Sequence, residues 1–168
     1  MRVAILTVSD RAARGERADQ TGPALQEFLH AAGAEVVTLE VVPDERPQIA
    51  AVLRRWCAND VADLILTNGG TGFAPRDVTP EATAEVIERP APGIPEAIRA
   101  ASLKITPRAM LSRATAGIRG RSLIINLPGS PTAARECLEA VLPTLPHAVE
   151  LLRGEVTDCA QSPIVDTS

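Results

Sequence analysis

Short apolar runs alternate along the chain with longer segments that are apolar on one side only. Runs rich in Val, Ile and Leu cover residues 3–8, 35–42 and 63–67, and all three have the length and composition of strands. The first and third are typical of buried strands. The segments between them carry apolar side chains three or four residues apart, at Leu25, Phe28, Leu29 and Ala32 and again at Ile49, Val52, Leu53 and Trp56. This spacing predicts two amphipathic helices, and the alternation of strands and helices predicts a parallel sheet with right-handed crossovers.

The second half of the chain continues the pattern more weakly. We expect a short helix to about residue 88, a proline-rich joint, and a helix around residues 96–103. A short antiparallel element that turns at Gly120 then leads into a further central strand, which ends at Leu127. Two more helices should follow this strand, the first of them carrying apolar side chains at helical spacing.

The third apolar run ends in a loop that has the character of an anion site. Three glycines fall within four residues of this loop, which reads Asn68, Gly69, Gly70, Thr71 and Gly72. Because glycine lacks a Cβ, a ligand can lie against such a backbone, and several N–H groups can converge on one phosphate oxygen. Arg76 and Asp77 follow as a cation and a carboxylate, and a helix should then start with Thr79 as its N-cap. A glycine-rich turn formed for packing alone is the plainer alternative.

Polar or turn-forming residues also follow the other predicted strands. They are Ser9 and Asp10 after the first strand, Asp44 after the second, and Pro128, Gly129 and Ser130 after the last. Parallel strands present their carboxyl ends at one edge of a sheet, so we expect the residues after the first two strands to lie beside the glycine loop. Ser130 is a good N-cap, and the start of a helix after a glycine is also an anion site. Asp44 and Asp77 are the two acids placed to hold Mg²⁺.

Each of these residues has a purely structural interpretation as well. Asp44 could cap the following helix, Asp77 could form a turn, and Ser130 could serve only as an N-cap. Arg11 and Arg14 fit a solvated loop as well as they fit a ligand site. The combination of carboxylates and arginines around a glycine loop favours a catalytic interpretation. Phosphoryl or nucleotidyl transfer needs aligned reactants, Mg²⁺ spanning phosphate oxygens, and cations against developing charge.

Composition and motif searches narrow the function classes. At 168 residues the chain fits one domain over residues 1–154, with a C-terminal tail at residues 155–168. A net charge of −4 and 2% aromatic residues argue against a nucleic-acid partner. No apolar run reaches membrane-spanning length, no signal peptide begins the chain and its cysteines form no C-x-x-C pair, so we expect a cytoplasmic protein without a membrane partner. The dinucleotide, P-loop, zincin and serine-hydrolase motifs are all missing from the sequence.

Four motifs, in this order, carry a resemblance to a known family. They are Thr67-Asn68-Gly69-Gly70-Thr71-Gly72, Arg76-Asp77-Val78-Thr79-Pro80-Glu81-Ala82, Ser112-Arg113 with Ala116-Gly117, and Leu127-Pro128-Gly129-Ser130-Pro131. Together they resemble the molybdopterin-binding family of molybdenum-cofactor biosynthesis. Within it they are most similar to the MogA-type molybdopterin adenylyltransferases, which are similar to the G domain of gephyrin. The resemblance extends over nearly the whole chain.

The resemblance implies a fold, a reaction and a set of site residues. The fold is an α/β three-layer fold with a mostly parallel sheet and helices on both faces, assembled as a homotrimer. The reaction transfers AMP from ATP to the terminal phosphate of molybdopterin, with Mg²⁺, and releases pyrophosphate. The implied catalytic and metal-binding pair is Asp44 and Asp77. The implied binding residues are Ser9, Asp10, Asn68, Gly69, Gly70, Thr71, Gly72, Arg76, Ser112, Arg113, Pro128, Gly129 and Ser130.

The family also supplies the main alternative. The MoaB branch is similar in fold and glycine loop, and it implies a non-catalytic pterin-binding or scaffold protein. Retention of Asp44 and of the segment at residues 77–80 favours the catalytic branch. A molybdate-insertion partner is a further implication of the resemblance. An unrelated small sugar-phosphate transferase is a weaker interpretation, because it does not account for four motifs in four separate loops.

Overall fold

A six-stranded sheet of order β2-β1-β3-β6-β5-β4 forms the centre of the computed structural model, which describes residues 1–154. The strands are β1 (Arg2–Val8), β2 (Glu35–Val42), β3 (Leu64–Asn68), β4 (Arg89–Pro90), β5 (Ala116–Arg119) and β6 (Ser122–Leu127). β2, β1, β3 and β6 are parallel, whereas β5 is antiparallel to β6 and β4 is antiparallel to β5. The carboxyl ends of four strands therefore meet at one edge of the sheet, as the sequence pattern predicts.

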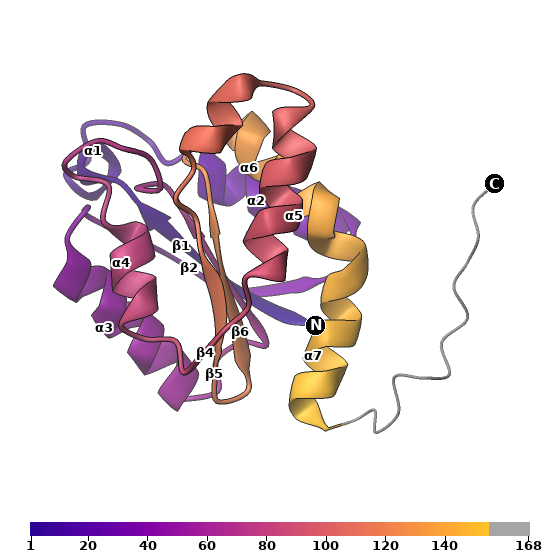
Figure 1. Cartoon of the computed structure of the whole chain (residues 1–168). Helices are drawn as coiled ribbons and strands as arrows, with labels where there is room; N and C mark the ends of the chain where they lie inside the picture. The colour runs from indigo at the N-terminus through magenta and orange to yellow at the C-terminus, as the bar shows by residue number, and fades with distance from the viewer. Residues whose placement is uncertain (155–168) are drawn as a thin grey trace.

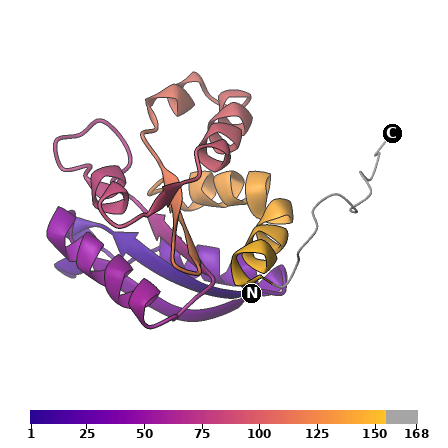
Figure 2. The same cartoon turned by 60° about the horizontal axis from the view of Figure 1, so that its bottom comes forward.

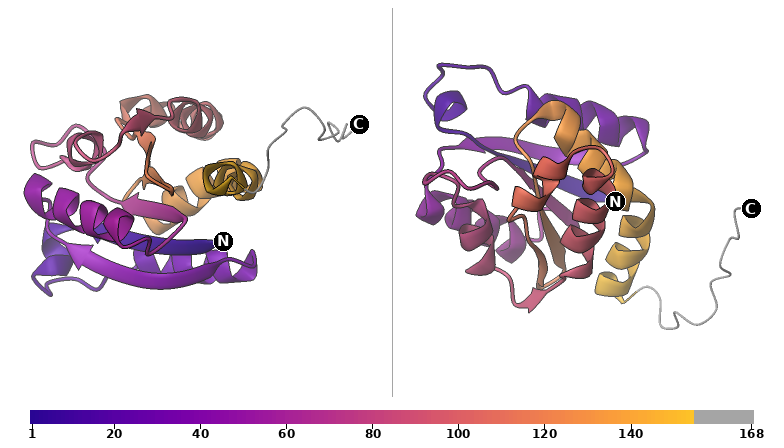
Figure 3. Two further views of the ribbon diagram at one scale, coloured as in Figure 1. Left: turned by 90° about the horizontal axis from the view of Figure 1, so that it is seen from below. Right: turned by 45° about the horizontal axis from the view of Figure 1, so that its top comes forward.

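Helices cover both faces of this sheet (Figures 1 and 2). They are α1 (Asp10–Ala13), α2 (Thr21–Ala31), α3 (Arg46–Ala58), α4 (Thr79–Ala84), α5 (Gly93–Leu103), α6 (Pro131–Val141) and α7 (Leu145–Arg153), with the 3-10 helices η1 (Pro107–Leu111) and η2 (Leu142–Thr144). α3 and α4 pack on one face, and α2, α5, α6 and α7 lie on the other, as Figure 3 shows from two further sides. The predicted three-layer α/β fold with helices on both faces is confirmed.

The two faces follow from the alternation of side chains along each strand. In β1, Val3 and Ile5 belong to the core under α2 and α6, whereas Ala4 and Leu6 belong to the core under α3. All four side chains are fully buried, because a central parallel strand is covered on both faces. Within residues 1–154, no helix combines the length and apolar character needed to cross a membrane.

Several predicted helix ends and one predicted turn are confirmed. Ser130 is the N-cap of α6, where its Oγ accepts a hydrogen bond from the Ala133 N–H at 3.2 Å. Gly120 turns the β5–β6 hairpin with a φ of +54°. Gly154 ends α7 with a φ of +71°, in the left-handed region that glycine tolerates best. The predicted tail lies outside the described residues.

Three local predictions are wrong. Thr79 is not the N-cap of α4, because it is already helical and its hydroxyl donates instead to the Gly69 carbonyl at 2.8 Å. α4 ends at Ala84, earlier than expected, because the chain then turns into β4, a strand too short to give a sequence signal. α5 starts at Gly93 and so takes up part of the expected proline-rich joint.

A buried carboxylate ties the last helix to the start of the sheet. Asp63 is 5% exposed, and it accepts hydrogen bonds from the Arg2 N–H at 2.8 Å and from Arg2 Nη2 at 3.0 Å. Arg153, at the end of α7, pairs with the same carboxylate. Burial alone would raise the pKa of Asp63, but the hydrogen bonds from Arg2 and the charge of Arg153 outweigh it, so the pKa lies below its ordinary value.

Replacing this carboxylate should destabilise the fold. We expect Asp63→Asn to lower the free energy of unfolding by about 2–3 kcal/mol at neutral pH, because it leaves two arginines without a buried partner. Urea unfolding measures the loss. A depressed native pKa stabilises the fold above the unfolded value, so the difference should shrink as pH falls below the ordinary value of 3.8 and wild-type Asp63 becomes protonated.

Asp60→Asn is the matched control. Asp60 is half-exposed and reaches Arg2 only at 3.4 Å, so its loss should cost less than about 0.5 kcal/mol. Equal losses in the two variants would contradict the role given to the buried pairing of Asp63.

Candidate functional site

Four loops meet at the carboxyl edge of the sheet. They follow β1 (residues 9–20), β2 (residues 43–45), β3 (residues 69–78) and β6 (residues 128–130). Figure 1 shows the loops after β1 and β3 side by side near α1, and hydrogen bonds between Arg76 and Asp10 join them. The edge that the sequence pattern predicts as the ligand site is thus formed by loops that contact one another.

At positions 69 and 70 of the glycine loop only glycine fits. Gly69 and Gly70 have φ values of +100° and +62°, which side chains rarely adopt. A Cβ at Gly69 would collide with the Val8 carbonyl oxygen, and one at Gly70 would collide with the Thr79 hydroxyl and lie 3.0 Å from Asp44 Oδ1. The loop is therefore pressed against its neighbours, with an acid directly beside it.

Three N–H groups of this loop remain available to a ligand. The Gly69 N–H donates to the Leu127 carbonyl at 3.1 Å and fixes the start of the loop on β6. Within residues 1–154, no protein acceptor bonds the N–H groups of Gly70, Thr71 and Gly72. Successive unbonded N–H groups in a turn of this kind can converge on an anion such as a phosphate oxygen.

Two aspartates join the β1 and β2 loops reciprocally. The Asp10 N–H donates to Asp44 Oδ2 at 2.8 Å, and the Asp44 N–H donates to Asp10 Oδ1 at 3.1 Å. Arg76 adds the glycine loop to this contact, because its Nε and Nη2 donate to the two carboxylate oxygens of Asp10 at 3.0 and 2.9 Å. Arg76 also pairs with Glu45 at 2.8 Å. The hydrogen bonds from Arg76 lower the pKa of Asp10.

Asp44 is the carboxylate in this group that lacks compensation. Burial raises its pKa above the ordinary value, and the negative charges of Asp10 and Asp77 raise it further. The N–H of Asp10 and the charge of Arg76 offset this only in part. A half-buried acid that is crowded by two others is a place where a cation binds favourably.

Asp77 and Arg113 hold the outer part of the glycine loop. Asp77 Oδ2 accepts a hydrogen bond from the Ala74 N–H at 2.8 Å, so this acid does form a turn, while no donor within residues 1–154 bonds its other oxygen. Arg113 Nε donates to the Gly72 carbonyl at 2.7 Å and Nη2 donates to the Asp77 carbonyl at 2.5 Å. The same guanidinium pairs with Glu81. Arg113 therefore clamps both ends of the turn that presents Asp77.

A polar cavity of about 220 Å³ lies between the β1 loop and the glycine loop. Ser9, Arg17, Asp19, Asp44, Gly70 and Gly129 are among the residues that line it. Its walls combine main-chain atoms of glycine with carboxylates and one guanidinium, which is the lining expected for a phosphate held with a metal ion.

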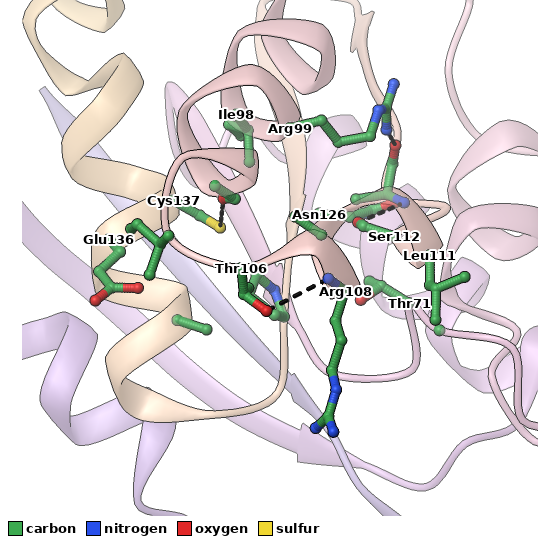
Figure 4. A pocket seen from close by; sticks show the side chains of 17 residues that line it. Thr71, Ile98, Arg99, Thr106, Arg108, Leu111, Ser112, Asn126, Glu136 and Cys137 are labelled. Atoms are coloured by element: carbon green, nitrogen blue, oxygen red, sulfur yellow. Dashed lines mark hydrogen bonds between the residues drawn. The ribbon is translucent and has the colours of Figure 1, made fainter.

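A second, apolar cavity of about 280 Å³ lies on the other side of the glycine loop (Figure 4). Thr71 and Ser112 line one side of it, and Cys137 of α6 lies on the other. Ile98 of α5 and Leu111 of η1 add apolar walls. Burial raises the pKa of the Cys137 thiol, so this side chain is neutral, whereas Glu136 beside it brings a carboxylate to the same wall. The cavity suits a flat ring system whose charged end reaches the loop.

The structure divides the predicted site residues into three groups. Ser9, Asp44, Asn68, Gly69, Gly70 and Gly129 line the polar cavity. Thr71, Gly72, Ser112 and Pro128 line the apolar one. Asp10, Arg76, Asp77, Arg113 and Ser130 line neither, and their side chains bond other parts of the chain. The roles of all of these residues as ligands or catalysts stay predictions.

Sequence reasoning missed Asp19, which organises the floor of the polar cavity. Its Oδ2 accepts a hydrogen bond from Thr7 Oγ1 at 2.7 Å, and Thr7 Oγ1 in turn accepts one from Asn68 Nδ2 at 3.0 Å. Its Oδ1 accepts from the N–H groups of Thr21 and Gly22 at 3.0 and 3.1 Å. The signal for this role was an Asp just before a helix start, which is a typical capping position.

Within residues 1–154 the site offers two carboxylates, Asp44 and Asp77, to a metal ion, and not a complete set of protein ligands. Among the described residues, no group of three or more His, Cys, Asp or Glu side chains could hold a metal ion by itself. Mg²⁺ commonly binds proteins through one or two carboxylates and completes its shell with water and substrate phosphates. The uncompensated charge of Asp44 and the unbonded oxygen of Asp77 fit that kind of binding.

Comparisons with known proteins point to one family. A family model described as "Probable molybdopterin binding domain" matches residues 4–147. A molybdopterin adenylyltransferase of Helicobacter pylori is 47% identical over 154 residues, which cover 90% of this chain and 88% of that protein. Gephyrin of Dictyostelium discoideum is 45% identical over 163 residues, covering 91% of this chain and 23% of that longer protein.

Solved structures agree in fold with these sequence relatives. A structure of the molybdopterin biosynthesis enzyme MoaB from Thermus thermophilus is 59% identical and has a TM-score of 0.86, covering 91% of this chain and 96% of that one. A structure of MogA is 40% identical and has a TM-score of 0.84, covering 90% of this chain and 99% of that one. Both the MogA and the MoaB branch are thus represented among the similar structures.

The crowding of acids around Asp44 predicts a stability cost at neutral pH. A carboxylate whose native pKa is raised destabilises the fold once it ionises, and this penalty disappears below its unfolded pKa. We therefore expect Asp44→Asn to raise the melting temperature of the ligand-free chain at pH 7 by roughly 2 °C. The amide oxygen of Asn can still accept the hydrogen bond from the Asp10 N–H, so the loop contact is kept.

Differential scanning calorimetry across pH measures this effect. The gain should vanish at low pH, where the wild-type carboxyl is protonated as well. Glu45→Gln is the neighbouring control, because Glu45 is paired with Arg76 and its replacement should bring no gain. A melting temperature for Asp44→Asn below that of the wild type at pH 7 would contradict the assigned crowding.

Proposed function

The chain belongs to the molybdopterin-binding domain family, and from this membership we propose that it is a molybdopterin adenylyltransferase. In the proposed reaction AMP passes from ATP to the terminal phosphate of molybdopterin, and pyrophosphate is released. The relatives named as adenylyltransferases match over most of their length, and this supports a transferase.

The observation that carries the proposal is the placement of the glycine loop between two cavities of different character. On one side the loop meets a polar cavity with Asp44, and on the other it meets an apolar cavity large enough for a ring system. A reaction that joins two phosphate compounds needs two substrates whose phosphates meet. We infer that the phosphates meet at the unbonded N–H groups of the loop and that the pterin ring lies in the apolar cavity.

We infer further that the reaction depends on Mg²⁺, which Asp44 and Asp77 would hold together with phosphate oxygens. When bound, the ion neutralises phosphate charge and favours departure of pyrophosphate. The residues of the chain contribute alignment and a fixed polar environment. The amides of Gly70, Thr71 and Gly72 can donate to oxygens on which negative charge develops, and Arg113 keeps the turn before Asp77 rigid.

We also propose a cytoplasmic homotrimer that passes its product to a molybdate-insertion partner. Support for self-association comes from large apolar side chains that the single chain leaves exposed between the end of α5 and the end of η1, namely Leu103, Ile105, Met110 and Leu111, of which Ile105 and Leu111 also line the apolar cavity.

The second candidate function is a pterin-binding protein without transferase activity. A structure at 59% identity carries the name MoaB, which belongs to the other branch of the family, but the same name calls that protein a biosynthesis enzyme and so does not itself favour a carrier. A carrier would use the apolar cavity and would have no need of the acids in the polar one. Calorimetry with ATP and Mg²⁺ separates the two, since a carrier should have no magnesium-dependent affinity for the nucleotide.

Asp77→Asn tests the proposed transfer. We expect it to lower the rate of AMP transfer about 100-fold, because the variant loses one of the two carboxylates proposed to hold Mg²⁺. Its amide oxygen can still accept the Ala74 N–H, so the loop and the binding of molybdopterin should persist. The measurement is formation of adenylylated molybdopterin from purified protein, ATP and Mg²⁺, with Asp60→Asn as a remote acidic control. Full turnover by Asp77→Asn would remove this residue from the mechanism.

The assembly is tested by sedimentation. We expect a species of about three times the 17.7 kDa chain mass in analytical ultracentrifugation at micromolar concentration. A single species of the chain mass at that concentration would contradict the trimer, and the transfer proposal would stand independently of that result.

A further inference from the structure

Most of the cations near the glycine loop are already committed to other parts of the chain. Arg76 is paired with Asp10 and Glu45, and Arg113 is bonded to two carbonyls and Glu81. Neither arginine lines the polar cavity. Both hold the loop in position, and the substrate binding that the resemblance implies for them stays a prediction.

Arg17 is different, because it lines the polar cavity and lacks an acidic partner. Within residues 1–154 its guanidinium pairs with no carboxylate, and its side-chain contact is a hydrogen bond from Nη2 to Gln20 Oε1 at 3.4 Å. Arg14 lies three residues earlier in the same loop, but it is bound to Glu16 by hydrogen bonds from Nε at 2.7 Å and Nη2 at 3.3 Å, and it does not line the cavity. The two arginines thus share a loop and differ in what they face.

The chain holds Arg17 at the cavity from both sides. Gly15 turns the backbone after α1 with a φ of +70°, and the N–H groups of residues 16 and 17 then donate to the Arg11 carbonyl at 2.9 and 3.3 Å. Two residues further on, Asp19 is fixed by hydrogen bonds from Thr7 and from the start of α2. Only Ala18 separates Arg17 from this anchor, so the position of its backbone is set before any ligand arrives.

The charge of the cavity calls for such a cation. The other ionisable side chains that line it are Asp44 and Asp19, both acids. The N–H groups at the start of α2, which could otherwise face an anion, are taken up by Asp19. A phosphate in this cavity would meet two carboxylates, and Arg17 is the side chain there that can offset them with planar, charged hydrogen bonds.

We propose that Arg17 binds the phosphate oxygens of a substrate at the polar cavity. This rests on the proposed transfer reaction, in which both substrates carry phosphate: the nucleotide as a triphosphate and molybdopterin as a monoester. Arg17 is then the direct phosphate ligand from the side chains of the β1 loop, while Arg113 bonds carbonyls of the glycine loop and Arg76 joins that loop to Asp10 and Glu45. The assignment adds a residue to the site that the motifs resembling the family do not include.

The test compares Arg17→Gln with Arg14→Gln. Isothermal titration calorimetry measures the dissociation constants of ATP with Mg²⁺ and of molybdopterin for each full-length variant, and steady-state transfer gives KM and kcat. We expect Arg17→Gln to weaken one of the two substrates about 10-fold, because a charge-assisted hydrogen bond to phosphate is lost. Arg17→Lys should recover part of the affinity, and Arg14→Gln should match the wild type.

The two arms identify which phosphate Arg17 contacts. Weaker ATP binding with unchanged molybdopterin binding assigns it to the nucleotide, and the reverse assigns it to the pterin phosphate. Unchanged affinity for both substrates in Arg17→Gln overturns the proposal, and so does an equal loss in Arg14→Gln, which would point to the general field of the loop. Wild-type protein that binds neither substrate refutes the proposed function itself, an outcome distinct from these two. Melting curves of both variants verify that each is folded.

Discussion

Close approach of main chains at Gly69 is the constraint on which the rest of the structure depends. At this point the end of β3 touches the carbonyl of Val8 on β1, donates its N–H to Leu127 on β6 and accepts the Thr79 hydroxyl from α4. A Cβ on Gly129 would itself lie 3.3 Å from the Gly69 Cα. Three strand ends and one helix start are therefore fixed relative to one another through a residue without a side chain. The N–H groups of the next three residues have no protein acceptor within residues 1–154.

Electrostatics at the same edge works against stability and in favour of binding. The negative charge of Asp10 is balanced by Arg76, and the Asp10 N–H is bonded by Asp44. The charge of Asp44 itself lies beside two further acids, Asp10 and Asp77. A fold optimised for stability alone would place a neutral side chain there. A cation bound at Asp44, as proposed above, would recover the free energy that this charge costs the fold.

The sequence predicts the fold well because its signals are periodic and local. The apolar runs of β1, β2 and β3, the glycine that turns the hairpin and the cap of α6 each depend on a few adjacent residues, and the structure has each of these elements where the sequence predicts it. β1 and β3 are buried, whereas β2 lies at the edge of the sheet and is partly exposed. The failures occur where tertiary contacts decide. Thr79 has the residue type of a cap, but its hydroxyl finds the Gly69 carbonyl first, and β4 exists only because β5 is beside it.

The candidate site divides in the same way between what residue types reveal and what only partners reveal. Spacing brought Asp44 and the glycine loop to one edge, because parallel strands end together. It could not distinguish among Arg14, Arg17, Arg76 and Arg113, since each is a cation in a polar loop until its acceptors are known. Three of the four donate hydrogen bonds to carboxylates or carbonyls of the chain. An arginine that is bonded in this way stabilises the loop, and its guanidinium is less available to a ligand. The function of an arginine at this edge therefore depends on its hydrogen-bond partners. The partner of Arg14 is two residues away, but Arg76 and Arg113 find theirs in segments far apart in the sequence.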